Sequence, residues 1–164
     1  ISFRYPRLAI RGVKMDEELQ VLPIGKAEVV REGKNVAILS FGHVFELAEA
    51  AVEQLDSEGI QPMLVNARFC KPLDEELLFR LAREGYDIVT VEEGAAMGGF
   101  GSAVLECLAA AGFHQVRVEV VAVPDYFVEH GSVKEQREEV GLTADAIAAR
   151  VRALLPMTRG VVEA

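Results

Sequence analysis

The sequence predicts one α/β domain, in which helices cover both faces of a mostly parallel β-sheet. Three observations favour this class. Short runs of branched apolar residues alternate with segments of helical periodicity. One of those runs is apolar almost throughout, which is typical of a central strand. The length of 164 residues suits a single hydrophobic core.

Five runs rich in branched apolar residues are predicted to be strands. They span Lys26–Val30, Val36–Phe41, Met63–Asn66, Ile88–Val91 and Val116–Val121. The loop that joins the first strand to the second contains Gly33 and Lys34, and it is too short for a parallel crossover. We therefore expect these two strands to form an antiparallel hairpin at or near the sheet edge.

Four further segments carry apolar residues at helical spacing. Their apolar stripes run over Val44–Leu55, Leu77–Leu81, Ala103–Ala111 and Ile147–Leu155. Asp74 and Thr143 precede two of these segments and are the residue types that cap helix N-termini, so we predict both as N-caps.

Composition excludes several classes of function. Lys and Arg total 17 against 26 Asp and Glu, so the net charge is −9 and nucleic acid is not an expected partner. No apolar run is long enough to span a membrane, and no signal peptide is visible. Cys70 and Cys107 lack metal-ligand spacing and are predicted to be reduced core or near-surface thiols, which favours a cytoplasmic location.

Polar and glycine-rich runs follow all four predicted parallel strands. Because ligands of open α/β sheets bind beyond the carboxyl ends of the strands, we place the candidate site at this edge. The opposite ends carry ordinary turns such as Glu58-Gly59 and Glu84-Gly85. The four runs are Gly42-His43, Ala67–Asp74, Glu92–Gly101 and Pro124–Gly131.

Each run has two interpretations. Glycines at 98, 99 and 101 could bind an anion on backbone N–H groups, but their spacing favours a tight turn and close strand–helix packing. Glu92 and Glu93 could be an acid–base pair, although adjacent strand residues point to opposite faces.

The histidines are equally open to two interpretations. His43 and His130 could carry protons or make local hydrogen bonds, and Asp125 and Glu129 lie near His130 in the sequence. Neither histidines nor carboxylates show metal spacing, and no diphosphate-binding motif is complete, so no metal site and no cofactor site is predicted in this chain.

The N-terminal arm contains Arg4-Tyr5-Pro6-Arg7. A guanidinium is the natural clamp for a phosphate. Residues three apart in an extended segment point to opposite faces, so Arg4 and Arg7 need not serve one ligand. Considered by spacing alone, a surface charge on a linker is the favoured interpretation.

Several motifs together resemble the 1-deoxy-D-xylulose-5-phosphate synthases, in order and approximate spacing from Arg4 to about Leu155. The glutamate pair and glycine loop are shared with the wider transketolase C-terminal family, which includes 2-oxo-acid dehydrogenase β subunits. The motifs are Arg4–Arg7, Leu22–Lys26, Arg68–Asp74, Val91–Gly94, Met97–Ser102 and Pro124–Gly131.

The resemblance implies the third domain of a three-domain transferase. Its fold would be a three-layer α/β/α sandwich of five strands, the first antiparallel to the others. Residues 1–20 would be an arm from the preceding pyrimidine-binding domain, 21–156 the domain and 157–164 a flexible tail. The full-length enzyme, expected to be a homodimer, would hold thiamine diphosphate and Mg²⁺ between its first two domains.

The implied reaction condenses pyruvate with glyceraldehyde 3-phosphate, toward isoprenoid, thiamine and pyridoxal precursors. The resemblance implies that Arg7 binds the acceptor's phosphate, although Leu8 follows where the family usually has glycine. Arg4 and Tyr5 would support the strand leaving the second domain. Arg68, Asp125 and His130 match family positions without an assigned step. The resemblance implies no catalytic residue in this chain, which alone is expected to bind no cofactor and to be inactive. The alternatives are the tail of a 2-oxo-acid dehydrogenase β subunit, or a free-standing binding module.

Overall fold

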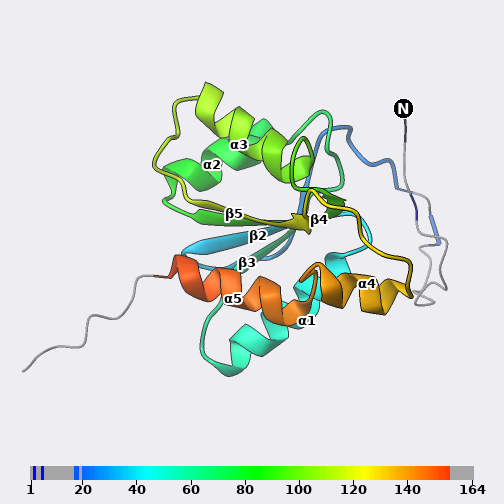
Figure 1. The fold of residues 1–164 in the computed structure, drawn as a ribbon. Helices are drawn as coiled ribbons and strands as arrows, with labels where there is room; N and C mark the ends of the chain where they lie inside the picture. Colours follow the sequence, from blue (N-terminus) through cyan, green and yellow to red (C-terminus); the bar gives the residue numbers. More distant parts are fainter. Residues whose placement is uncertain (1, 3–4, 6–16, 19, 156–164) are drawn as a thin grey trace, which may run out of the picture.

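The computed structural model describes residues 2, 5, 17–18 and 20–155. They form three layers around one β-sheet, with helices α1, α4 and α5 on one face and α2 and α3 on the other (Figure 1). The five strands are β1 (Glu28–Arg31), β2 (Val36–Phe41), β3 (Met63–Asn66), β4 (Asp87–Ala95) and β5 (Val118–Val123). The helices are α1 (Phe45–Ser57), α2 (Glu75–Arg83), α3 (Phe100–Ala110), α4 (Val133–Glu139) and α5 (Ala144–Leu154).

The strand order is β1-β3-β2-β4-β5, with β1 antiparallel and the remaining strands parallel. The predicted fold class is therefore confirmed, and β1 is an edge strand as expected. The predicted hairpin between β1 and β2 is wrong. β3 lies between these two strands and is the partner of β1.

The connection from β1 to β2 is not a hairpin turn. It crosses over the start of β3 and so joins two strands that are not neighbours. Two strand spacings amount to about 10 Å, which the four residues 32–35 span when extended. Lys34 N–H donates to the Gln61 carbonyl at 2.8 Å during the crossing. A Cβ at Gly33 would overlap the backbone of Pro62 and Met63, so only glycine fits at this position.

The central strands bury side chains on both faces, which explains their apolar runs. Ile38 packs toward α1 and α5, whereas its neighbours Ala37 and Leu39 pack toward α2 and α3. Because successive residues of a strand alternate between faces, one nearly apolar strand supplies both halves of the core.

The predicted helix caps are both present. The Asp74 carboxylate accepts from Leu77 N–H at 3.2 Å and also from Ala27 N–H at 3.0 Å, so it ties the segment before β1 to the start of α2. Thr143 Oγ1 accepts from Ala146 N–H at 3.2 Å. Helix α4 was not predicted, because its seven residues bury no side chain and so carry no apolar stripe.

Candidate site at the carboxyl edge of the sheet

The four predicted runs do gather at one edge of the sheet, on the right-hand side of Figure 1 where β5 ends and α4 lies. Because β1 is antiparallel, its N-terminal end lies at this edge too. The described residues 20–27 therefore lead into the domain at the same edge as the candidate site.

Glu92 lies at the centre of this edge, and its side chain is buried, with 2% exposure. Its carboxylate accepts from the backbone N–H groups of Phe100 and Gly101, each at 2.8 Å. A carboxylate at this position satisfies N–H groups that have no partner inside the helix, and it complements the positive end of the helix dipole. Glu92 therefore caps α3 from a neighbouring strand.

This contact decides between the two interpretations of the glycine loop. The anion on the first turn of α3 is a side chain of the protein itself, so these N–H groups are not open to a ligand. A Cβ at Gly101 would approach Thr90 Oγ1 to 2.7 Å and Val120 Cγ1 to 2.8 Å. Gly101 therefore serves close packing of α3 on β4 and β5, and Gly98, with φ of 74°, serves the tight turn, as their spacing favoured.

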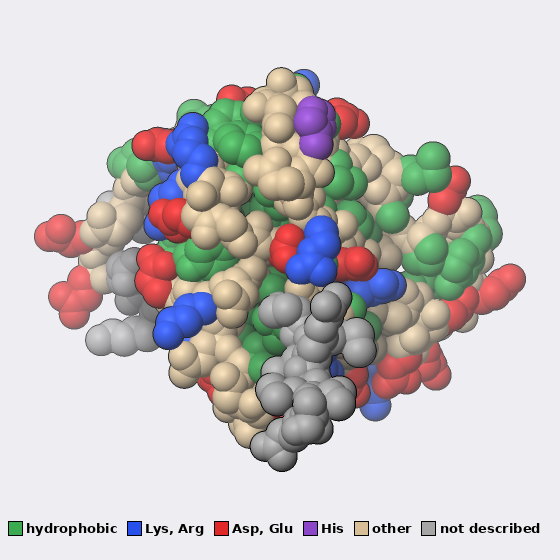
Figure 2. All heavy atoms as spheres, turned by 90° about the vertical axis from the view of Figure 1, so that its left-hand side faces the viewer, with side chains coloured by type: hydrophobic (Ala, Val, Ile, Leu, Met, Phe, Trp, Pro, Cys, Tyr) green, Lys and Arg blue, Asp and Glu red, His purple; other side chains and the backbone are tan. Residues whose placement is uncertain are grey.

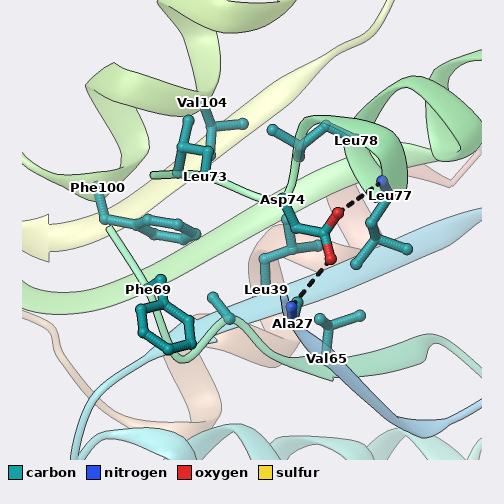
Figure 3. Close-up of a pocket in the computed structure, with 11 residues that line it drawn as sticks. Ala27, Leu39, Val65, Phe69, Leu73, Asp74, Leu77, Leu78, Phe100 and Val104 are labelled. Carbon is teal, nitrogen blue, oxygen red and sulfur yellow. Dashed lines mark hydrogen bonds between the residues drawn. The ribbon is translucent and has the colours of Figure 1, made fainter. Parts of the chain in front are cut away.

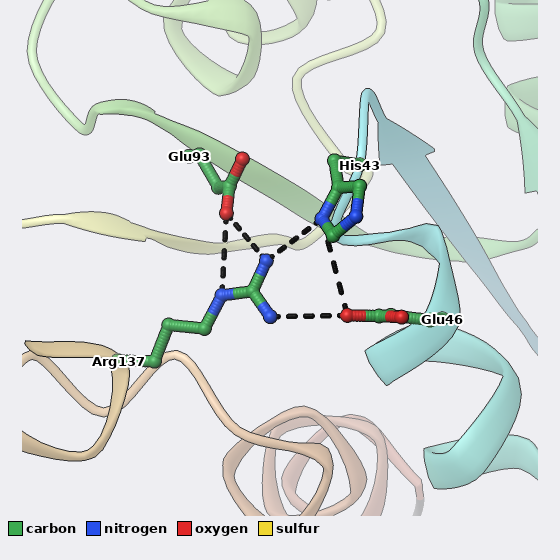
Figure 4. Close-up of polar contacts among 4 residues, drawn as sticks. All are labelled: His43, Glu46, Glu93 and Arg137. Atoms are coloured by element: carbon green, nitrogen blue, oxygen red, sulfur yellow. Dashed lines mark hydrogen bonds and ion pairs between the residues drawn. The ribbon is translucent and has the colours of Figure 1, made fainter. Parts of the chain in front are cut away.

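Glu93 points away from Glu92, as strand alternation predicts, and takes part in a polar cluster on the other side of the edge (Figure 4). Arg137 of α4 lies at the centre of this cluster. Its guanidinium donates to Glu93 Oε1 at 2.5 Å, to Glu46 Oε1 at 3.1 Å and to His43 Nδ1 at 3.0 Å. The two glutamates thus act apart, and no acid–base pair forms between them.

The cluster attaches α4 to the rest of the edge. Burial by itself lowers the pKa of Arg137, but its hydrogen bonds to Glu93 and Glu46 outweigh burial and raise that pKa. The Arg137 guanidinium therefore keeps its positive charge, and its hydrogen bond holds the His43 ring in place. Since Arg137 donates to Nδ1, that nitrogen is an acceptor, so His43 makes the local hydrogen bond that was one of its two interpretations. Sequence reasoning missed Arg137.

Arg68 is held inside the chain. Its backbone lies in the left-handed region, with φ of 57°, and its N–H donates to Asn66 Oδ1 at 3.2 Å. The guanidinium donates to Glu28 Oε2 of β1 at 2.6 Å. Arg68 therefore joins the ends of β1 and β3, and this ion pair gives it a structural role.

Asp125 and His130 lie in the loop between β5 and α4, and both are exposed. The same loop exposes Phe127 by 96% and Tyr126 by 51%. This loop and Arg68 lie beyond opposite sides of the sheet, because β5 and β3 are separated by β4 and β2. The structure thus does not bring the three predicted family positions into one site.

The predicted arm residues Arg4 and Arg7 lie outside the described residues. Tyr5 is described and is exposed. Cys70 and Cys107 are free, half-buried thiols, and burial raises the pKa of both. Within the described part of the chain, no three His, Cys, Asp or Glu side chains are grouped as a metal site would require. Nor does any helix described here combine the length and apolar character needed to cross a bilayer.

A small cavity lies between α2, α3 and the ends of β2 and β3 (Figure 3). Its volume is about 10 Å³, and apart from the Asp74 carboxylate its lining is apolar. That carboxylate already accepts hydrogen bonds from Ala27 and Leu77. The cavity is about the size of one water molecule, so it is a packing defect rather than a substrate pocket.

Comparison with known proteins assigns the family. The profile of the transketolase C-terminal domain matches residues 25–147. The chain belongs to the transketolase C-terminal domain family. A 1-deoxy-D-xylulose-5-phosphate synthase of Brevibacillus brevis is 81% identical over all 164 residues, which make up 26% of that protein and form its C-terminal part. A synthase of a Geobacillus species is 47% identical over 156 residues, or 95% of this chain and 25% of that one.

A solved structure agrees with the family. The chain resembles a split-gene transketolase, described as an inactive β4 tetramer, with a TM-score of 0.75 and 36% identity. The match covers 82% of this chain and 43% of the transketolase chain. The chain thus spans about a quarter of the length of the curated relatives it matches. These matches favour the synthases over the 2-oxo-acid dehydrogenase β subunits and the free-standing module considered above.

Proposed function

We propose that this chain is the C-terminal domain of a 1-deoxy-D-xylulose-5-phosphate synthase. The full-length enzyme would use thiamine diphosphate and Mg²⁺ to condense pyruvate with glyceraldehyde 3-phosphate in the cytoplasm, as a homodimer. The observation that carries the proposal is the 81% identity to such a synthase over every residue of the chain. Residues 1–20 would be the arm from the pyrimidine-binding domain, 21–156 this domain and 157–164 its tail.

The role of this domain in that enzyme is structural rather than chemical. The residues at the carboxyl edge do not fit a diphosphate, because the Glu92 carboxylate already occupies the N–H groups of Phe100 and Gly101. A second anion there would meet a buried negative charge. We therefore assign no step of the reaction to this domain and expect the cofactor to be held by the other domains.

Assay of the full-length gene product tests the proposal. We expect it to form 1-deoxy-D-xylulose 5-phosphate and CO₂ only when both substrates and the cofactor are present. The 164-residue chain should form none and should give no saturable heat when titrated with thiamine diphosphate and Mg²⁺. A full-length protein without this activity would contradict the proposal, as would micromolar binding of the cofactor by the 164-residue chain.

Within this proposal, Arg7 holds the phosphate of glyceraldehyde 3-phosphate. A bidentate contact of this kind contributes roughly 1.5–3 kcal/mol per hydrogen bond. Arg7→Ala in the full-length enzyme should lower kcat/KM for the phosphorylated acceptor by roughly ten- to several-hundredfold. Kinetic constants for pyruvate should change far less, because pyruvate carries no phosphate.

Two further variants make the test of Arg7 specific. Arg7→Lys should recover part of the loss, since an ammonium group cannot reproduce the planar fork of a guanidinium. Arg159→Ala, a matched change near the C-terminus, should leave the kinetic constants of both substrates unchanged. Equal damage to the constants of both substrates, or damage to neither, would mean that Arg7 does not bind the acceptor.

A further inference from the structure

The loop between β5 and α4 exposes an apolar surface that the domain does not use. Phe127 is 96% exposed, and Tyr126 beside it is 51% exposed. Met97, which follows β4, is 72% exposed. Ala96 N–H donates to the carbonyl of Val123, the last residue of β5, at 2.8 Å. Met97 therefore lies next to the end of β5, and Tyr126 follows that end by three residues. We call Met97, Tyr126 and Phe127 the edge patch.

The edge patch lies on a well-anchored loop. Tyr126 N–H donates to the Pro124 carbonyl at 2.9 Å, and Gln136 Nε2 donates to the Glu129 carbonyl at 3.0 Å. The loop ends at the capping box of Ser132 and Glu135, which starts α4. Arg137 then fixes α4 to the sheet edge. Aromatic side chains presented on a fixed backbone are typical of the central residues of protein interfaces, because little conformational entropy is lost on binding.

We propose that the edge patch is a docking surface whose occupant is the part of the same polypeptide that precedes this domain, presenting an apolar surface bordered by basic side chains. This inference rests on the proposed function, because it requires the longer chain of the synthases. It adds to that function the residues by which the C-terminal domain attaches to the remainder of the enzyme.

The direction of the chain favours this occupant. Residues 20–27 enter the domain at the carboxyl edge on the β1 side of the sheet, where Asp74 holds Ala27, and the patch lies at the same edge on the β5 side. Figure 1 shows this edge with α4 beside it. The relatives are about four times as long as this chain, which covers 26% of the Brevibacillus synthase. A preceding domain tethered at this edge would meet the patch at a high effective concentration.

The acidic residues beside the edge patch favour the same occupant, with basic side chains around its apolar surface. Asp125 and Glu129 flank the exposed aromatic residues and are themselves exposed. The chain as a whole carries a net charge of −9. A second copy docking through the same loop would bring acidic side chains against acidic side chains, because a two-fold contact is self-complementary. A basic partner surface would instead pair with them.

Phe127→Asp in the full-length protein tests the inference. A buried aspartate would open the interface, so protease should cut the segment 1–20 about ten- to a hundredfold faster than in the unmodified protein. Leu105→Asp is the matched control, because Leu105 is an exposed apolar residue midway along α3, and it should leave the rate of cutting unchanged. In the 164-residue chain, Phe127→Asp should leave the melting temperature unchanged, which shows that the variant folds.

Two results would overturn the inference. The first is an unchanged rate of cutting in the full-length Phe127→Asp variant. The second is a 164-residue chain that dimerises and that Phe127→Asp returns to monomer, which would make a second copy the occupant. Failure of the proposed function would be seen in a different measurement. The unmodified full-length protein would then lack synthase activity, whatever the effect of Phe127→Asp on cutting of the segment 1–20.

Discussion

The amino and carboxyl edges of the sheet differ in how many of their surface side chains find partners within the domain. At the amino edge, polar groups and charges pair within the chain. Arg117 donates to Asp87 and to the Leu154 carbonyl, Arg152 pairs with Glu58, and Arg31 pairs with Asp56. Figure 2, viewed from the left-hand side of Figure 1, shows positive and negative side chains interspersed on the face that includes this edge.

The carboxyl edge also pairs charges within the chain, as Arg68 does with Glu28, but its outer loop leaves large apolar side chains exposed. Glu92 and Arg137 are fully engaged, whereas the loop outside them exposes Phe127, Tyr126 and Met97. Among the described residues, no large apolar side chain is exposed in the amino-edge turns. In many α/β domains the carboxyl edge holds ligands. In this domain its interior supports the fold, and its exterior is suited to contact with another domain.

The largest effect is expected where the inner layer of the carboxyl edge is broken. Glu92→Gln replaces one of two buried acceptors with an NH₂ group that faces a backbone N–H. We expect a loss of about 3 kcal/mol in the free energy of unfolding, since hydrogen bonds to charged groups contribute about 1.5–3 kcal/mol each. Denaturant unfolding of the 164-residue chain measures this loss.

Glu93→Gln is the matched control for that change. Its side chain is exposed, and its partner Arg137 retains Glu46, so we expect a loss within about 1 kcal/mol. Equal losses for the two variants would show that the buried cap of α3 contributes no more to stability than the exposed contact between Glu93 and Arg137.

A smaller loss of stability is expected at the amino edge, where the backbone crossing is tight. In Gly33→Ala the new methyl group would overlap the backbone of Pro62 and Met63, which cannot move aside as a flexible side chain can. We expect a loss of about 2 kcal/mol, the range of overpacked sites. Calorimetric melting of the 164-residue chain measures it.

The control for this crossing is Gly131→Ala at the other edge. A Cβ there would meet its nearest neighbour, Glu135, at an ordinary 3.5 Å. The expected change is within about 0.5 kcal/mol, as for other surface substitutions. A Gly131→Ala loss as large as that of Gly33→Ala would mean that the loop before α4 is packed as tightly as the β1–β2 crossing.

The smallest effect concerns the exposed ion pairs of the amino edge. The hydrogen bond from Arg152 lowers the pKa of Glu58 in the folded state. Because the folded pKa lies below the unfolded value of about 4.3, the pair stabilises the fold above that pH, and this contribution is lost as the pH falls through the folded pKa. Glu58→Gln should therefore slightly lower the melting temperature at pH 7 and leave it unchanged once the pH is below the folded pKa. A difference that persists at low pH would show that another contact of Glu58 is responsible.

Local pattern predicted much of the fold but not the pairing of strands. The bounds of β2 and β3 were predicted correctly, because both are short, apolar and followed by clear polar runs. The β1–β2 hairpin was wrong because a short connection can also step over an intervening strand, and only the packing of Gly33 on β3 reveals this. β4 extends four residues beyond the predicted Val91, because its end pairs again with β5 at Ala95.

The gathering of the polar runs at one edge was predicted, but the contacts within them were not. Topology alone locates the polar runs at one edge, and alternation along β4 alone separates Glu92 from Glu93. The partners depend on tertiary contacts, so neither the capping of α3 by Glu92 nor the position of Arg137 could be read from spacing. Helix α4 did carry a local signal, the Ser132 and Glu135 capping box, which was not recognised.

Amide hydrogen exchange of the 164-residue chain and of the full-length protein, compared peptide by peptide, tests the contrast between the two edges most directly. We expect exchange in residues 124–131 to slow in the full-length protein, while the amino-edge turns at 57–60 and 84–87 exchange alike in both. Equal exchange of residues 124–131 in the two proteins, or slowing confined to the amino-edge turns, would contradict it.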